Sequence, residues 1–295
     1  MLSLSVNCLF HILSLLPVRL TGALGAGIGR LFYYLDKRHR HIAIRNLSRI
    51  YPEQSQLWRR RIARESVAEM GRTLFEMPHV FLRSRAFLLS RIDYKGVDAA
   101  RSLIDSGQSV IFTTCHHSNW ELAAQTMALL GYPSDQIYRP LRQQPLDILL
   151  KQWRERFGNS LHSRSENIRW LPKVIRSGRA VALMIDQHLS TGEPIPFLGH
   201  QANTTTLPTI FTIKKDIPVF AATLHRMGRQ FRFRMEFRQI SFPPKTLHKQ
   251  RDIIERTEII SDAFASAIHA RPELWLWVHR RWLYLDEQEG TAPHN

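Results

Sequence analysis

Residues 110–121 of the chain have the sequence VIFTTCHHSNWE. Its first five residues form an apolar, β-branched run of the kind that makes a buried strand. A histidine pair and an acid follow at once, as His116, His117 and Glu121. An imidazole titrates near neutral pH and accepts a proton, and a nearby carboxylate fixes its tautomer and stabilises the imidazolium. Such a pair at the end of a strand can activate a hydroxyl, which indicates acyl transfer.

Which histidine pairs with Glu121 depends on where the following helix begins. On a continuous helix His117 and Glu121 share a face, whereas His116 and Glu121 point about 140° apart. His116 reaches Glu121 only if it lies on the loop before the helix. The residues alone leave both pairings open, and a histidine beside a strand is more often structural or solvated than functional.

Strand and helix patterns alternate along the rest of the chain. With 295 residues, 44% of them hydrophobic, the chain has enough apolar material for one large core. Buried strands are expected at 110–114, 180–185 and 218–223, and amphipathic helices at 55–76 and 253–268. Residues 230–240 alternate apolar and charged side chains, the pattern of a half-exposed strand, which is usually antiparallel. The sequence therefore predicts an α/β fold with a single mixed sheet and helices on both faces.

The N-terminal segment is apolar and bears on membrane attachment. Residues 1–18 contain no Asp, Glu, Lys or Arg, but this run is at the short end of the roughly 20 residues that span a bilayer. No basic segment precedes it, which argues against a cleaved signal peptide. If it spans, the basic residues after it place the body in the cytoplasm. The alternative is an interfacial hairpin of amphipathic helices.

These patterns divide the chain into three parts. Residues 1–35 form a membrane-associating segment, in which Gly25-x3-Gly29 has the spacing of closely packed helices. Residues 36–286 form the main domain, and residues 287–295 a polar tail. Cys8 and Cys115 are far apart in the sequence, which fits a reducing compartment. Cys115 next to His116 could be a thiol nucleophile, but a small buried residue at the end of a strand is the better interpretation.

The residues around the histidine pair resemble a known family. His116-x4-Glu121 is similar to the H-x4-D/E motif of the bacterial late lipid A acyltransferases, the lauroyl and myristoyl transferases within the lysophospholipid acyltransferase group. Further segments occur in the order and spacing of that family and cover nearly the whole chain: Asn46-Leu47, Tyr51-Pro52-Glu53, Tyr138-Arg139-Pro140-Leu141, Ile185-Asp186-Gln187, Pro196-Phe197-Leu198-Gly199, Thr204-Thr205-Thr206 and 272–282.

The resemblance implies a glycerolphosphate acyltransferase-like fold and transfer of a fatty acyl chain from an acyl carrier protein thioester to a hydroxyl of a lipid A precursor. By the same match His116 is the general base, and Glu121 orients and charges it. The nucleophile is the oxygen of the substrate, so no acyl-enzyme and no cofactor or metal is required. Backbone N–H groups at the start of the next helix would bind the oxyanion. The implied location is the cytoplasmic face of the inner membrane.

The resemblance also suggests residues that contact the substrates. Arg139 follows a short strand, where a guanidinium could bind a phosphate, and Arg164 follows the turn at 158–159. Solvated surface arginines are the plain alternative. Asp186 and Gln187 end a strand, where α/β proteins gather ligands, although a capping role fits them equally well. Gly199 belongs to an implied substrate loop or only satisfies a turn with positive φ.

The three tryptophans of the C-terminal region have two possible roles. Trp275, Trp277 and Trp282 are interleaved with His and Arg, which resembles an interfacial belt at the headgroup level. Packing in the core also explains at least some of them.

The net charge of the chain bears on its partners, and several other functions remain open. Forty-one Lys and Arg against 25 Asp and Glu give a net charge of +16, which suits an acidic carrier protein, a phosphorylated glycolipid and a negative membrane. Nucleic acid also attracts basic chains, but zinc-finger, basic-zipper and RNA-recognition patterns are missing from the sequence. An acyltransferase for another glycolipid or a lysophospholipid remains open, as do a metal-dependent hydrolase that uses His116, His117 and Glu121, and a non-catalytic basic membrane-binding protein.

Overall fold

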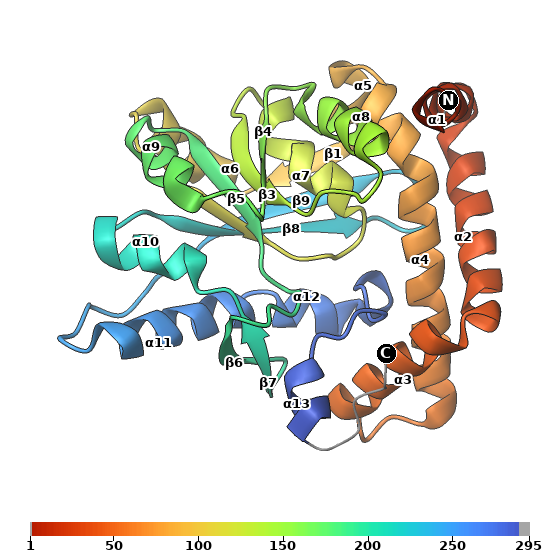
Figure 1. The fold of residues 1–295 in the computed structure, drawn as a ribbon. Coiled ribbons are helices and arrows are strands. Elements are labelled where there is room, and N and C mark those ends of the chain that lie inside the picture. The colour runs from red at the N-terminus through yellow and green to blue at the C-terminus, as the bar shows by residue number, and fades with distance from the viewer. Residues whose placement is uncertain (1, 289–295) are drawn as a thin grey trace.

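A mixed sheet lies at the centre of the molecule (Figure 1). The structure is a computed structural model that describes residues 2–288, and seven strands of this part form the sheet in the order β1-β9-β8-β2-β5-β3-β4. Their bounds are β1 Ile92–Lys95, β2 Ile111–Thr114, β3 Ser134–Tyr138, β4 Ser160–Ser163, β5 Ala180–Met184, β8 Val219–Arg226 and β9 Phe233–Gln239. A separate hairpin consists of β6, Glu193–Phe197, and β7, His200–Thr204.

The direction of the strands follows from their side chains. β2, β5 and β8 are apolar runs buried on both sides, and β8, β2, β5, β3 and β4 run parallel to one another. β9 alternates buried aromatic or Met residues with exposed charged ones and pairs antiparallel with β8. The prediction of an α/β fold with a mixed sheet is therefore confirmed.

Helices cover both faces of this sheet (Figure 1). α5 Arg85–Leu89, α6 Val97–Asp105 and α7 Trp120–Leu129 pack on one face, and α9 Leu171–Arg176, α10 Leu207–Lys215, α11 Lys249–Asp262 and α12 Ala265–Ala270 pack on the other. The remaining helices are α1 Leu2–Leu15, α2 Val18–Leu35, α3 Lys37–Ile50, α4 Gln56–Leu82, α8 Gln144–Glu155 and α13 Leu283–Gln288, with short 3₁₀ turns at Ile168–Trp170 and Pro272–Leu274.

The helix expected over 253–268 consists of two helices. α11 ends at Asp262 and α12 begins at Ala265. Phe264, in the turn between them, is completely buried, so the break directs this ring into the core. The helix expected over 55–76 is α4, which continues through Pro78 to Leu82. Of the expected polar tail, residues 289–295 lie outside the described residues.

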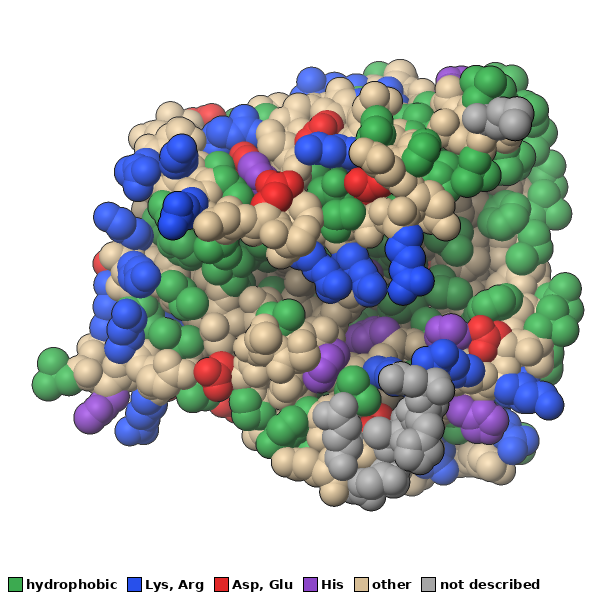
Figure 2. Space-filling model, in the orientation of Figure 1, with side chains coloured by type: hydrophobic (Ala, Val, Ile, Leu, Met, Phe, Trp, Pro, Cys, Tyr) green, Lys and Arg blue, Asp and Glu red, His purple; other side chains and the backbone are tan. Residues whose placement is uncertain are grey.

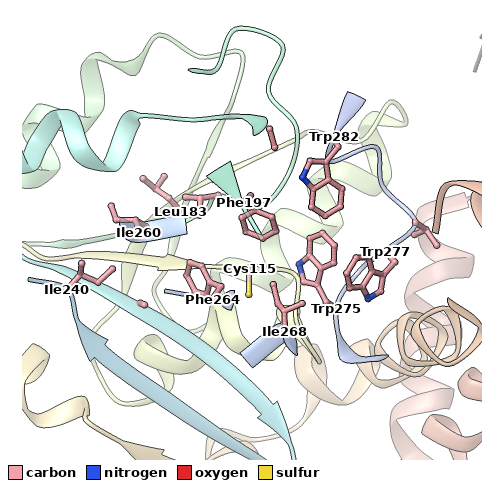
Figure 3. Packing of buried hydrophobic residues seen from close by; sticks show 14 of the residues in the cluster. Cys115, Leu183, Phe197, Ile240, Ile260, Phe264, Ile268, Trp275, Trp277 and Trp282 are labelled. Atoms are coloured by element: carbon pink, nitrogen blue, oxygen red, sulfur yellow. The ribbon is translucent and has the colours of Figure 1, made fainter. Parts of the chain in front are cut away.

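The three C-terminal tryptophans belong to the core. Figure 3 shows Trp275, Trp277 and Trp282 packed together beside Phe197, and at most 1% of the surface of each tryptophan is exposed. Trp275 meets Trp277 edge to face with the ring centroids 4.7 Å apart. The idea of an interfacial belt is therefore wrong for these indoles, because burial leaves none of them available to a membrane.

The N-terminal helices pack directly on the long helix α4. Gly25 and Gly29 of α2 face Gly71 and Val67 of α4, so closely that a Cβ atom built on Gly25 would lie 2.4 Å from the carbonyl oxygen of Gly71. Absent side chains at these positions let the two backbones touch. Among the described residues, no helix is both long enough and apolar enough to cross a membrane.

The contact between α2 and α4 can be tested by alanine substitution. Gly25→Ala should destabilise the protein by about 1–3 kcal/mol, because the added methyl group forces the backbones of two helices apart. Gly27→Ala is the matched control in the same helix, since a Cβ there meets nothing within 4 Å. It should stabilise the protein by about 0.5–1 kcal/mol through helix propensity. Denaturant unfolding measures both, and equal effects would contradict this account of the packing.

Candidate active site

Four of the predicted site residues gather at one edge of the sheet because they follow parallel strands. His116 comes after β2, Asp186 directly after β5, Arg139 after β3 and Arg164 after β4. These four strands run in the same direction, so their carboxyl ends meet at the edge where α/β proteins gather ligands.

The structure gives His116 a different carboxylate partner from the one expected. Nδ1 of His116 lies 2.7 Å from Oδ1 of Asp186, and the backbone N–H of His116 donates to Oδ2 at 2.7 Å. The indole N–H of Trp275 donates to the same oxygen at 2.8 Å. Asp186 is completely buried, so its carboxylate holds the imidazole of His116 and does not face a substrate.

Glu121 pairs instead with an arginine that the sequence analysis overlooked. Nε and Nη2 of Arg154, from α8, donate to its two carboxylate oxygens at 2.9 and 2.5 Å. This bidentate geometry is the strongest form of an Arg–carboxylate pair. Glu121 is in the first turn of α7, which begins at Trp120, so His116 and His117 both precede the helix.

The two ion pairs together set the charge of His116. Burial alone would lower its pKa, but the charge of Asp186 and the hydrogen bond to it outweigh burial, and the pKa rises above 6.5. Glu121 adds to this rise and Arg154 opposes it. Burial would raise the pKa of Asp186, yet His116 holds it well below the ordinary range. The histidine is therefore a stronger base than a free imidazole.

His117 has a different environment. It is 1% exposed, its Nδ1 lies 2.9 Å from the carbonyl oxygen of Leu224, and burial lowers its pKa to about 4. It is therefore a neutral core residue. Within residues 2–288, no three His, Cys, Asp or Glu side chains gather closely enough to hold a metal ion. His116, His117 and Glu121 thus do not form the set of ligands that a metal-dependent hydrolase would need.

The second nitrogen of His116 opens onto a large cavity. This cavity has a volume of about 760 Å³, and His116, Trp120, Glu121 and Arg154 line it. Figure 2 shows a hollow across this face of the molecule, with basic side chains (blue) along its upper rim and histidines (purple) along its lower rim. Nε2 of His116 lies 3.2 Å from the side-chain amide nitrogen of Gln187.

The remaining predicted residues differ in their relation to this cavity. Arg139, Arg164 and Gln187 line it and are exposed. Gly199 is not among its lining residues; with Leu198 it forms the tight turn between β6 and β7, where φ is 80° and 50°. This position requires the left-handed conformation that glycine adopts most easily.

Cys115 is buried and burial raises its pKa well above 9.0, which suits a packing residue and not a nucleophile.

A buried ion cluster supports the loop that carries His116. Arg226, at the end of β8, pairs with Glu69 and Glu76 of α4, and Glu76 accepts a hydrogen bond of 2.9 Å from the side chain of Asn119. Asn119 also caps α7 through the backbone N–H of Leu122. The preceding Ser118 has a φ of 58°, a strained value for a residue other than glycine. The cluster therefore fixes the start of the helix on which Glu121 sits.

Comparison with known proteins identifies the family of the chain. The family model described as bacterial lipid A biosynthesis acyltransferase matches residues 2–284. The chain belongs to this family. It is similar to the lipid A biosynthesis myristoyltransferase of Escherichia coli, to which it is 24% identical over 90% of this chain and 82% of the relative. The lauroyltransferase of the same organism is 22% identical over 90% of this chain and 86% of the relative. The chain is therefore a lipid A biosynthesis acyltransferase.

Membership of the lipid A acyltransferase family makes the charge of His116 testable by kinetics. We expect His116 to be a general base, which acts only when neutral, so kcat/KM should fall as the pH drops through a value above 6.5. Asp186→Asn removes the main cause of the raised pKa. The substitution should move the fall in kcat/KM to lower pH. It should also reduce kcat by roughly 10³–10⁴, as expected when a base loses its orienting carboxylate. If kcat/KM of Asp186→Asn falls at the same pH as that of the unchanged protein, the expected role of His116 as the base is contradicted.

Proposed function

We propose that this protein transfers a fatty acyl chain from an acyl carrier protein thioester to a hydroxyl group of a lipid A precursor. The observation that carries the proposal is the pair of His116 and Asp186. Asp186 binds Nδ1 of the imidazole and leaves Nε2 facing a cavity of about 760 Å³. This arrangement suits removal of a proton from a hydroxyl held in the cavity.

In the proposed reaction the oxygen of the acceptor lipid is the nucleophile. Nε2 of His116 takes the hydroxyl proton as the oxygen attacks the thioester carbonyl, which forms a tetrahedral intermediate. As the intermediate collapses, the C–S bond breaks, and His116 returns the proton to the departing thiolate sulfur. The products are an ester and a free thiol, and the enzyme ends in its initial state. Asp186 stabilises the imidazolium between the two proton transfers.

The negative charge on the intermediate requires donors near the carbonyl oxygen. The first turn of α7 begins beside His116, and Trp120 and Glu121 line the cavity, so their backbone N–H groups are suitable donors. Arg154 lines the same cavity and is a second source of positive charge. Glu121 acts in this proposal through Arg154, which it holds in a bidentate pair, and through its charge on His116.

The lining of the cavity fits the two ends of the substrates. Apolar side chains, among them Phe112, Met127, Leu183 and Phe237, provide surface for an acyl chain. Arg139 and Arg164 provide exposed guanidinium groups for a phosphate of the acceptor. A cavity lined by both apolar and basic side chains suits a phosphorylated lipid.

A different glycolipid is the second candidate for the acceptor. A phosphatidylinositol mannoside acyltransferase of Mycobacterium tuberculosis is 22% identical over 74% of this chain and 68% of the relative. The same base and cavity would act on a hydroxyl of such a lipid. Matches to lauroyl-, myristoyl- and palmitoleoyltransferases of lipid A synthesis, with the basic residues at the cavity, favour the lipid A precursor.

We further propose that the enzyme works at the cytoplasmic face of the inner membrane. α1 and α2 expose large apolar side chains on their outer side, including Leu20, Leu24, Ile28 and Leu31, each at least 46% exposed. Figure 2 shows hydrophobic side chains (green) over the edge where these helices lie. Arg19 and Arg30 interrupt α2, so a helix lying in the interface suits the sequence better than a spanning one.

An acyl-transfer assay tests the proposed reaction. Purified protein in detergent receives acyl carrier protein thioesters of several chain lengths and a phosphorylated, tetra-acylated lipid A precursor. His116→Ala should lower kcat by about 10²–10⁴, because general base catalysis is worth that much. Cys115→Ala should keep nearly full activity, and His117→Ala should lose less than His116→Ala. Equal losses in the two histidine variants would mean that the wrong histidine has been assigned.

The role proposed for the cavity arginines gives a second kinetic test. Arg139→Gln and Arg164→Gln should each raise the KM for the phosphorylated acceptor by about tenfold, since a charge-assisted contact contributes roughly 1.5–3 kcal/mol. kcat at saturating acceptor should change little. Arg176→Gln, an exposed arginine on α9 outside the cavity lining, is the control. Unchanged KM in both cavity variants would remove these residues from the acceptor site.

A further inference from the structure

A second cavity is lined by residues of α2 and α4 and by residues near the end of β8. It has a volume of about 680 Å³ and shares no lining residue with the candidate active site. α2, α4, the turn between β8 and β9, and the segment from Arg271 to Leu274 contribute to its walls. We call this cavity the arginine cleft, because its described lining contains seven arginines and three glutamates.

The charges in the arginine cleft are not balanced. Arg226 is 3% exposed and engaged with Glu69 and Glu76, so it forms part of the floor. Arg30 pairs with Glu65, and Arg271 pairs with Glu273. Arg61 and Arg229 have exposed side chains, and in the described part of the chain neither forms an ion pair. The carboxylates of Glu69 and Glu76 compensate the charge of Arg226, so the excess positive charge lies on Arg61 and Arg229. Their two free guanidinium groups favour an anion, and guanidinium geometry favours phosphate.

The arginine cleft borders the apolar face of α2. At 3.6 residues per turn, Leu20, Leu24 and Leu31 fall on one arc of this helix, and Arg19 and Arg30 fall together at one edge of it. Arg30 lines the cleft, and Arg19 donates to Gln230 in the turn between β8 and β9. The leucines of α2 therefore form an apolar strip, and arginines that can bind phosphate lie along one edge of it. A bilayer surface has the same order, with acyl chains next to phosphate groups.

We infer that the arginine cleft binds the phosphate groups of anionic phospholipid headgroups while the apolar face of α1 and α2 contacts the acyl chains. This inference rests on the proposed attachment to a membrane, but not on the proposed acyl transfer. An acidic protein would satisfy the charge of the cleft but would leave the adjacent leucines exposed. The contact of α2 with α4 through Gly25 and Gly71 keeps the apolar face and the cleft in one fixed orientation.

Vesicle flotation with the full chain tests the inference. The two vesicles are pure phosphatidylcholine and phosphatidylcholine with 30 mol% phosphatidylglycerol, both at low salt. The intact protein should bind the anionic vesicles more tightly. In Arg61→Gln/Arg229→Gln the affinity for anionic vesicles should fall by about thirtyfold, because each arginine at an anionic surface contributes about a factor of five, while binding to neutral vesicles should stay the same.

A matched control separates the cleft from net charge. Arg176→Gln/Arg251→Gln removes the same charge from exposed positions on α9 and α11, away from α2 (Figure 1). It should lose much less affinity than the cleft variant, and an equal loss would overturn the inference. Leu24→Gln/Ile28→Gln should weaken binding to both vesicles, and unchanged binding would remove the apolar face from the contact. Circular dichroism and the melting temperature confirm that each variant is folded.

Acyl transfer in detergent distinguishes the remaining outcomes. Arg61 and Arg229 lie outside the active-site cavity, so the cleft variant should keep its kcat and its KM for the carrier protein thioester. A raised KM for the thioester, together with normal binding to anionic vesicles, would assign the cleft to the acidic carrier protein and overturn the lipid site. If the intact protein binds vesicles as expected but transfers no acyl group, the proposed reaction fails while the lipid site stands.

Discussion

The carboxylate of Asp186 is buried beside His116 and must be compensated within the protein. A charge with no exposure to water is costly unless hydrogen bonds and an opposite charge compensate it. Asp186 receives these from the backbone and ring of His116 and from the indole of Trp275. The three donors belong to the loop after β2 and to the C-terminal core. One buried charge therefore joins the base, two neighbouring strands and the tryptophan cluster into a single unit.

Two ion pairs flank the imidazole and have different effects on it. In the described part of the chain no arginine donates a hydrogen bond to Asp186, and the charge of this carboxylate is the main cause that raises the pKa of His116. Glu121 forms a bidentate pair with Arg154, and the opposing effects of these two residues on His116 offset each other in part. The acid of the H-x4-E motif thus contributes less to the charge of the base than the acid that follows β5.

The sequence predicted the strands and the edge of the sheet because both follow from local patterns. Buried parallel strands leave long β-branched runs such as 110–114, and a half-exposed strand leaves the alternation of 230–240. The partner of His116 could not be predicted from the residues, because β2 and β5 are neighbours only through the order of the sheet. Arg154 has no signal at all in the sequence, since an arginine in an amphipathic helix resembles any surface arginine.

In the N-terminal region, too, the sequence pattern did not reveal which distant segment is the partner. The spacing of Gly25 and Gly29 indicated close packing, but only the structure shows that the partner is Gly71 of α4, within the main body of the protein. Burial of the three tryptophans could not be read from their spacing with His and Arg, because that spacing occurs in membrane belts and in cores alike.

The contact between α2 and α4 has a mechanical consequence. α4 also carries Glu76, which holds Asn119 and the start of α7. A surface touched by α1 and α2 is therefore coupled to the active-site loop through one continuous helix of 27 residues. If the N-terminal helices rest on a surface, as we propose, α4 sets the distance between that surface and His116.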